Sequence, residues 1–296
     1  MPSSEHEDLT PMLSQYHHFK KLYPDSLLFF RLGDFYELFY EDAQVGSREL
    51  GLALTSRPAG KSRERIPMCG VPYHSASSYI SKLVSRGYKV AICEQLEEGG
   101  QAKGLVRRDV VRVITPGTYF ESESCGLAGI FKSGSLYSCA YLNPATGEFI
   151  GASFDIKGVK EFLLRFSPKE LIIPESIDPK QLEVELFTNK VEEDYFYQGV
   201  RVLMESMRVY NPRGWGFERE EEILPFGAVY LYMKQTQRAF LPFIQKPKPY
   251  RDEGYVYIDY RTRRGLEILE SYEGSGRFTL FGVINRTLTG MGRRRL

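Results

Sequence analysis

Two apolar runs of strand length flank a two-residue turn near the start of the chain. The runs cover residues 26–32 and 35–40, and Gly33 and Asp34 lie between them. A Gly-Asp pair between two apolar runs is typical of a tight β-hairpin. The sequence therefore predicts two antiparallel strands that are joined at Gly33 and Asp34.

Side chains alternate between the two faces of a strand, and this alternation sorts the residues after the turn. The odd-numbered positions from 35 to 39 share one face. The even-numbered positions from 36 to 40 share the other face and are predicted to supply the core. This leaves an aromatic side chain, Phe35, beside a carboxylate, Glu37, near the tip of the hairpin. The pattern alone fits either a binding surface or an additional buried Phe beside a solvated Glu.

Helices and strands alternate over the first part of the chain, with short connections between them. Helices are predicted to end before Pro24, Gly51 and Gly87, since proline and glycine commonly terminate helices. Further strands are expected over residues 88–93 and 110–114, and residues 55–66 are interpreted as a polar loop. The pattern predicts a mixed-sheet α/β domain over residues 1–118.

A second α/β domain is predicted over residues 125–245. Two strands flank a turn at residues 143–147, and a helix, a strand and a last helix follow. Residues 175–222 are acidic and poorly periodic, so no element is predicted there. Lys246–Pro249 is interpreted as a linker. Residues 255–296 are predicted to form a short strand and a basic helical segment. The helical pattern continues to the last residue without a stop signal, so we expect a longer parent chain.

The composition excludes several classes of protein. The 39 basic and 38 acidic side chains give a net charge of +1, which excludes a uniformly basic DNA coat protein or an acidic tail. No apolar run reaches the roughly 18 residues of a membrane span, and the polar, acidic N-terminus is not a signal peptide. The four cysteines share no CxxC spacing, which predicts reduced thiols in a cytosolic protein.

Motifs for catalysis or for metal binding are incomplete. Gly60-Lys61-Ser62 resembles the end of a phosphate-binding loop, but Thr55 stands where that loop requires glycine. The histidines show no metal-ligand spacing. Four acidic residues near the hairpin are predicted to point in different directions rather than to form a nuclease centre; they are Asp34, Glu37, Glu41 and Asp42. We therefore expect no catalytic residue and no metal site.

Several segments, in order along the chain, resemble the bacterial MutS family of DNA mismatch-recognition ATPases. The first domain contributes Thr10-Pro11-Met12, LGDFYELFYEDA (32–43), IPMCGVPYH (66–74), VAICEQ (90–95) and VITPGT (113–118). Residues 125–240 resemble the connector domain of that family more loosely. DYRTRRGLEI (259–268) and LTGMG (288–292) resemble the start of its lever and core domain.

The resemblance implies a mismatch-binding domain, an RNase H-like connector domain and the beginning of a helical core. In this interpretation Phe35 stacks at a mismatched pair as a wedge, and Glu37 hydrogen-bonds the displaced base, while Tyr36 and Leu38 are structural. The family clamp and its C-terminal ATPase have no counterpart in these residues. ATP and Mg²⁺, dimerisation and MutL-like repair partners therefore belong to the full-length family, which acts in the bacterial cytosol on nucleoid DNA.

Contacts to the DNA backbone require cations, and the polar loop supplies most of the candidates. Five residues are predicted to approach phosphates: Arg57, Lys61, Arg63, Arg65 and His74. Each of them also fits a solvated surface charge. The alternative function is a truncated interaction module whose connector docks repair partners and which binds DNA weakly by itself.

Overall fold

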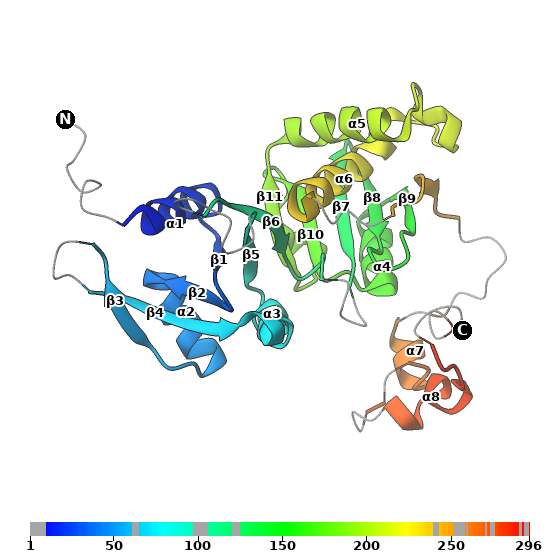
Figure 1. Cartoon of the computed structure of the whole chain (residues 1–296). Coiled ribbons are helices and arrows are strands. Elements are labelled where there is room, and N and C mark those ends of the chain that lie inside the picture. The colour runs from blue at the N-terminus through cyan, green and yellow to red at the C-terminus, as the bar shows by residue number, and fades with distance from the viewer. Residues whose placement is uncertain are drawn as a thin grey trace.

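Two β-sheets, each covered by helices, make up most of the molecule (Figure 1). The computed structural model describes residues 10–60, 65–96, 106–119, 125–238, 243–251, 258, 260–269, 271–272, 276–289, 292 and 296. In this part of the chain, no helix is both long enough and apolar enough to cross a membrane.

The first domain is built on a six-stranded mixed sheet with the order β3-β4-β2-β1-β5-β6. Its elements are α1 (Pro11–Leu22), β1 (Ser26–Leu32), β2 (Phe35–Phe39), α2 (Tyr40–Leu50), β3 (Thr55–Pro58), β4 (Arg65–Pro72), α3 (Ala76–Ser85), β5 (Lys89–Gln95) and β6 (Arg108–Ile114). β1 is parallel to β5, and the other pairs are antiparallel. The predicted hairpin is confirmed, because Leu32 pairs with Phe35 and Gly33 has a φ of +57°.

The polar loop predicted over residues 55–66 was wrong at both of its ends. β3 and β4 pair antiparallel there, with Arg57 opposite Ile66 and Pro58 opposite Arg65. Ile66 is buried in the core, and this long-range packing overrides the polar character of the neighbouring residues. Lys61 and Arg63 lie outside the described residues.

Helices cover both faces of the first sheet. Tyr36 and Leu38 face the core under α2 and α3, as predicted. Phe39, which alternation placed on the face opposite the core, is fully buried on the α1 side. The Tyr16 ring of α1 packs against it edge-on, with 5.1 Å between ring centroids. The prediction of a single core face was therefore wrong, because α1 adds a second one. Tyr40 has a φ of +53° and packs on this second core, not with Tyr36.

The second domain has the strand order β11-β10-β7-β8-β9-β12. Its elements are β7 (Leu127–Ser133), β8 (Leu136–Leu142), β9 (Phe149–Phe154), α4 (Ile156–Phe166), β10 (Glu170–Pro174), β11 (Phe187–Val191), α5 (Glu193–Met207), α6 (Leu224–Gln237) and β12 (Lys248–Pro249). An antiparallel meander, β7-β8-β9, is extended by parallel β10 and β11 next to β7. This is the expected RNase H-like arrangement.

Two parts of the second domain were not predicted from the sequence. The acidic region 175–222 contains β11 and the 15-residue helix α5, which packs with α6 on one face of the sheet, while α4 covers the other. Lys248 and Pro249, interpreted as part of a linker, pair with β9 as the edge strand β12. These three elements depend on partners elsewhere in the sequence, since β11 pairs with β10, α5 packs with α6 and β12 pairs with β9.

Short helices complete the described structure. They are the 3₁₀ helices η2 (Tyr73–Ser75), η3 (Pro179–Leu182), η4 (Pro212–Trp215), η5 (Glu220–Ile223) and η7 (Gly276–Phe278), and the α-helices α7 (Tyr260–Gly265) and α8 (Leu280–Ile284). Arg263 of α7 donates to the carbonyl of Leu164 in α4, so the helical segment contacts the second domain. The strand predicted at residues 255–259 lies almost wholly outside the described residues.

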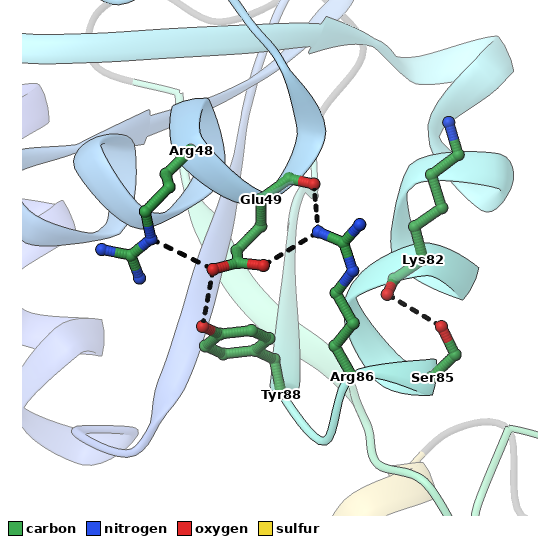
Figure 2. Close-up of polar contacts among 6 residues, drawn as sticks. All are labelled: Arg48, Glu49, Lys82, Ser85, Arg86 and Tyr88. Carbon is green, nitrogen blue, oxygen red and sulfur yellow. Dashed lines mark hydrogen bonds and ion pairs between the residues drawn. The ribbon is translucent and has the colours of Figure 1, made fainter.

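A charged cluster joins the end of α2 to the segment between α3 and β5 (Figure 2). The Glu49 carboxylate accepts hydrogen bonds from Arg48 (3.1 Å), Arg86 (2.8 Å) and the Tyr88 hydroxyl (3.1 Å). Hydrogen bonds from Arg48 and then Tyr88 lower the pKa of Glu49. The folded protein therefore favours the ionised form of this carboxyl.

We predict that Glu49→Gln lowers the melting temperature slightly at pH 7 and by less at about pH 3. A pKa that is lower in the folded state stabilises the fold above the unfolded-state pKa, and this stabilisation is lost as the pH falls through the folded-state value. Thermal unfolding of both proteins at the two pH values measures the difference. Glu205→Gln, at an exposed position on α5, is the control. An equal deficit at both pH values would contradict the electrostatic explanation.

Candidate nucleic-acid interface

Phe35 stands at the tip of the central hairpin and is 46% exposed. It is the first residue of β2 and lies between Leu32 of β1 and Pro72 of β4. The Asp34 carbonyl accepts a 2.9 Å hydrogen bond from the backbone N–H of Tyr73. The tip is thus attached to both neighbouring strands, so an exposed aromatic ring is held on a braced turn.

Glu37 lies on the same face as Phe35. A β-carbon placed on Gly70 of β4 would stand 3.6 Å from Glu37 Cγ and 3.9 Å from Phe35 Cδ1. The two side chains therefore flank one glycine, as the alternation predicts. Because Gly70 has no side chain, no β4 side chain stands against the ring and the carboxylate at this position.

Burial and a neighbouring cation act on Glu37 in opposite directions. Arg57 of β3 donates from Nη1 to Glu37 Oε2 at 3.0 Å, and the Glu37 side chain is 19% exposed. Burial raises the pKa of Glu37, and Arg57 offsets only part of this increase. The carboxyl consequently takes up a proton more readily than an ordinary surface glutamate.

Asp42, another acidic residue near the hairpin, lies apart from Glu37. Asp42 is buried on the α1 side, where it accepts hydrogen bonds from Lys20 (2.8 Å), Tyr16 (2.9 Å) and the backbone N–H of Leu28 (3.0 Å). It therefore ties α2 to α1 and β1. Asp42 and Glu37 therefore point into different surroundings.

Three of the five predicted backbone-binding residues lie in the described part of the chain, and they are divided between the β3–β4 ribbon and the hairpin tip. Arg57 is paired with Glu37 and also lies over the Phe39 ring, 5.7 Å from its centroid. Arg65 donates to Ser56 Oγ at 2.9 Å in the same β-ribbon. His74 is exposed in η2, beside the tip.

Sequence reasoning missed a stacked pair beside the tip. The Arg31 guanidinium lies 3.7 Å from the centroid of the Tyr73 ring, which is 46% exposed. Arg31 also contacts Glu94, whose carboxylate accepts a hydrogen bond from the Tyr36 hydroxyl. One signal was present in the sequence, since Arg31 is the single charged residue of the apolar run 26–32. Its partner lies 42 positions away and could not be inferred.

Comparison with known sequences agrees with this architecture. Residues 10–123 match the family model described as MutS domain I, and residues 125–245 match the model described as MutS domain II. The chain belongs to the MutS family. It is 56% identical over 295 residues to the DNA mismatch repair protein MutS of Aquifex pyrophilus. This match covers 99% of the present chain and 34% of the Aquifex pyrophilus protein.

Other MutS proteins show the same partial coverage. The protein of Persephonella marina is 48% identical over 300 residues, with 99% of this chain and 34% of that protein covered. The protein of Clostridium kluyveri is 42% identical over 306 residues, with 97% and 35% covered. The chain therefore spans about a third of the length of these MutS relatives.

We predict that Phe35→Ala and Phe39→Ala have very different effects on stability, although both remove a phenyl ring from β2. Phe39 is fully buried, so its truncation should cost about 3–5 kcal/mol of unfolding free energy. Truncation of the half-exposed Phe35 should cost about 1 kcal/mol of unfolding free energy or less. Chemical denaturation measures both values. Equal losses would mean that Phe35 is a core residue.

We predict that Arg57→Ala raises the pKa of Glu37 further, because it removes the cation that favours the ionised carboxylate. An NMR titration of the side-chain carboxyl carbon reports this pKa directly. Arg65→Ala is the matched control, since it removes a cation from the same ribbon that bonds to Ser56 instead. An unchanged pKa in Arg57→Ala would show that the ion pair is absent in solution.

Proposed function

We propose that this part of a MutS-family protein recognises mispaired or unpaired bases in duplex DNA by non-covalent binding. The observation that carries the proposal is the half-exposed Phe35 ring on a braced hairpin tip, with Glu37 beside it. An exposed aromatic at such a tip adds little to the core. It is, however, well suited to enter a base stack.

The proposed role of Phe35 follows from the mechanics of mismatched DNA. A mismatched pair is weakly stacked, so the duplex kinks there at lower free-energy cost than at a matched pair. An inserted aromatic ring converts this difference into binding energy, as other wedge side chains do in the minor groove. Stacking contributes about 1–3 kcal/mol and is tolerant of base identity, which suits a sensor of many mismatches.

The proposed role of Glu37 is to hydrogen-bond the displaced base. An ionised carboxylate near phosphates disfavours ordinary duplex, whereas a protonated carboxyl donates a hydrogen bond. The raised pKa of Glu37 lowers the free-energy cost of taking up that proton. Arg57 would then exchange its carboxylate partner for a phosphate, with Arg65 and His74 as further backbone contacts. Lys61 and Arg63 stay predictions of the same kind.

The remaining functional assignments are also proposals. The mechanism needs no ATP or Mg²⁺ bound to these residues, and it involves binding without catalysis. Dimerisation and the docking of MutL-like partners are assigned to the full-length family. Because only a few cations neutralise DNA phosphates, we expect weak DNA binding that depends strongly on salt concentration.

We predict that Phe35→Ala loses most of the preference for mismatched over matched duplex, because the wedge supplies the discriminating contact. Fluorescence anisotropy with the 296-residue chain and the two labelled duplexes at low salt measures this preference. Tyr210→Ala, which removes a fully exposed aromatic of the second domain, is the control. Glu37→Ala should reduce discrimination while binding to matched duplex holds or improves, because a negative charge is removed.

Two results would reject this mechanism. Retained discrimination in both Phe35→Ala and Glu37→Ala would transfer mismatch sensing to other residues. Weak and equal binding of the unaltered chain to both duplexes would instead favour the alternative of an interaction module.

A further inference from the structure

A buried carboxylate lies at the boundary between the two domains. Glu170, the first residue of β10, is fully buried. Its Oε2 accepts hydrogen bonds from Thr115 Oγ1 (2.5 Å) and the Gly117 N–H (2.9 Å). Its Oε1 accepts hydrogen bonds from Asn189 Nδ2 (2.6 Å) and the Tyr232 hydroxyl (2.6 Å). One oxygen thus binds the loop that leaves the first domain, and the other binds the second domain.

The donors around Glu170 match the needs of an ionised group. Burial of a carboxylate is costly unless donors occupy its lone pairs, and hydrogen bonds to a charged acceptor are the strong ones. Asn189 is itself oriented by Lys89 of β5, which donates to Asn189 Oδ1 at 2.8 Å. Lys89, a cation of the first domain, is therefore linked to the Glu170 carboxylate through Asn189. Both domains contribute to keeping Glu170 satisfied.

The contact between the loop and Glu170 leaves no space for a larger residue at position 117. A β-carbon on Gly117 would stand 2.6 Å from Glu170 Cβ and 2.6 Å from Leu127 Cδ2. Its backbone φ is not in the left-handed region. Alanine at this position would therefore be opposed by these contacts and not by backbone strain.

Further hydrogen bonds join the two domains along β6. Gln237, the last residue of α6, is fully buried. It donates to the Val113 carbonyl at 3.2 Å and accepts from Arg112 Nε at 2.7 Å. Arg238 contacts Asp109 of the same strand at 3.2 Å. In Figure 1, β6 accordingly lies at the boundary between the two sheets. The Thr115–Thr118 loop continues directly from this attached strand.

We propose that Glu170 is a positioning residue that sets the orientation of the first domain relative to the second. It does so by holding the Thr115–Thr118 loop against β10. The carboxylate thereby determines where the hairpin tip that carries Phe35 stands with respect to the second domain. The inference concerns domain geometry and does not depend on the proposed DNA-binding function.

A distance measurement without DNA tests the proposal. Nitroxide labels are placed at Gln44→Cys on α2 and Ser206→Cys on α5, both exposed. The four native cysteines are buried, so the introduced thiols are labelled selectively. Pulsed electron spin resonance then gives the distance distribution between the domains. The same chain without the two introduced cysteines measures background labelling.

Three variants separate a positioning role from a general effect on stability. Gly117→Ala and Thr115→Val disturb the loop side of Glu170, and we expect each to shift or broaden the distance distribution. Tyr232→Phe is the comparison variant, because it removes a hydroxyl donor to the same carboxylate from the second domain. Its hydroxyl also interacts with Thr115, but the hydrogen bonds from Thr115 and Gly117 to Glu170 remain in this variant. We expect Tyr232→Phe to keep the parental distribution. Amide hydrogen exchange in β1 and β8 verifies that both sheets remain folded.

Two results would overturn the proposal. One is a distance distribution in both Thr115→Val and Gly117→Ala that does not differ from that of the parent protein. The other is an equal shift in Tyr232→Phe and Thr115→Val, which would indicate a general role of Glu170 in the fold of the second domain. If Gly117→Ala does not fold, Thr115→Val decides alone, since it changes a single hydroxyl to a methyl group.

Discussion

Burial of the first sheet on both faces is the constraint on which the candidate interface depends. Three side chains on one face of β2 show a gradient of burial, because Phe39 is fully buried against Tyr16 of α1, the Glu37 side chain is 19% exposed and Phe35 is 46% exposed. The exposure of these side chains thus increases along β2 from Phe39 toward the hairpin tip. A ring at this position is presented by a rigid sheet and not by a free loop, which favours a contact with defined geometry.

The same gradient of burial gives Glu37 its particular chemistry. A carboxylate farther along β2 would be too deeply buried to reach a ligand, and one at the tip would be fully solvated and ordinary. At an intermediate depth, burial raises its pKa while Arg57 limits the increase. A suitable ligand can therefore replace one partner of the Arg57–Glu37 ion pair, since both side chains are partly exposed.

The second domain contributes to this interface by holding the first domain in place. Its sheet carries Glu170 at the boundary, and the carboxylate takes two hydrogen bonds from the connecting loop. A polar boundary of this kind differs from an apolar one, because a hydrogen bond to a buried charge is directional and tolerates little displacement. The geometry of the first domain is therefore linked to the fold of the second.

Local patterns determined much of this structure. The Gly33-Asp34 turn, the Thr10 cap of α1 and the alternation that places Phe35 beside Glu37 all follow from residues within a few positions of each other. The burial of Phe39, the strands within the polar segment and helix α5 required the tertiary structure. So did the Arg57–Glu37 pair, 20 positions apart, and the donors to Glu170, up to 62 positions away. The physical reason is range: turns and caps are decided by neighbouring backbone and side-chain geometry, whereas burial and ion pairing depend on which distant surfaces meet.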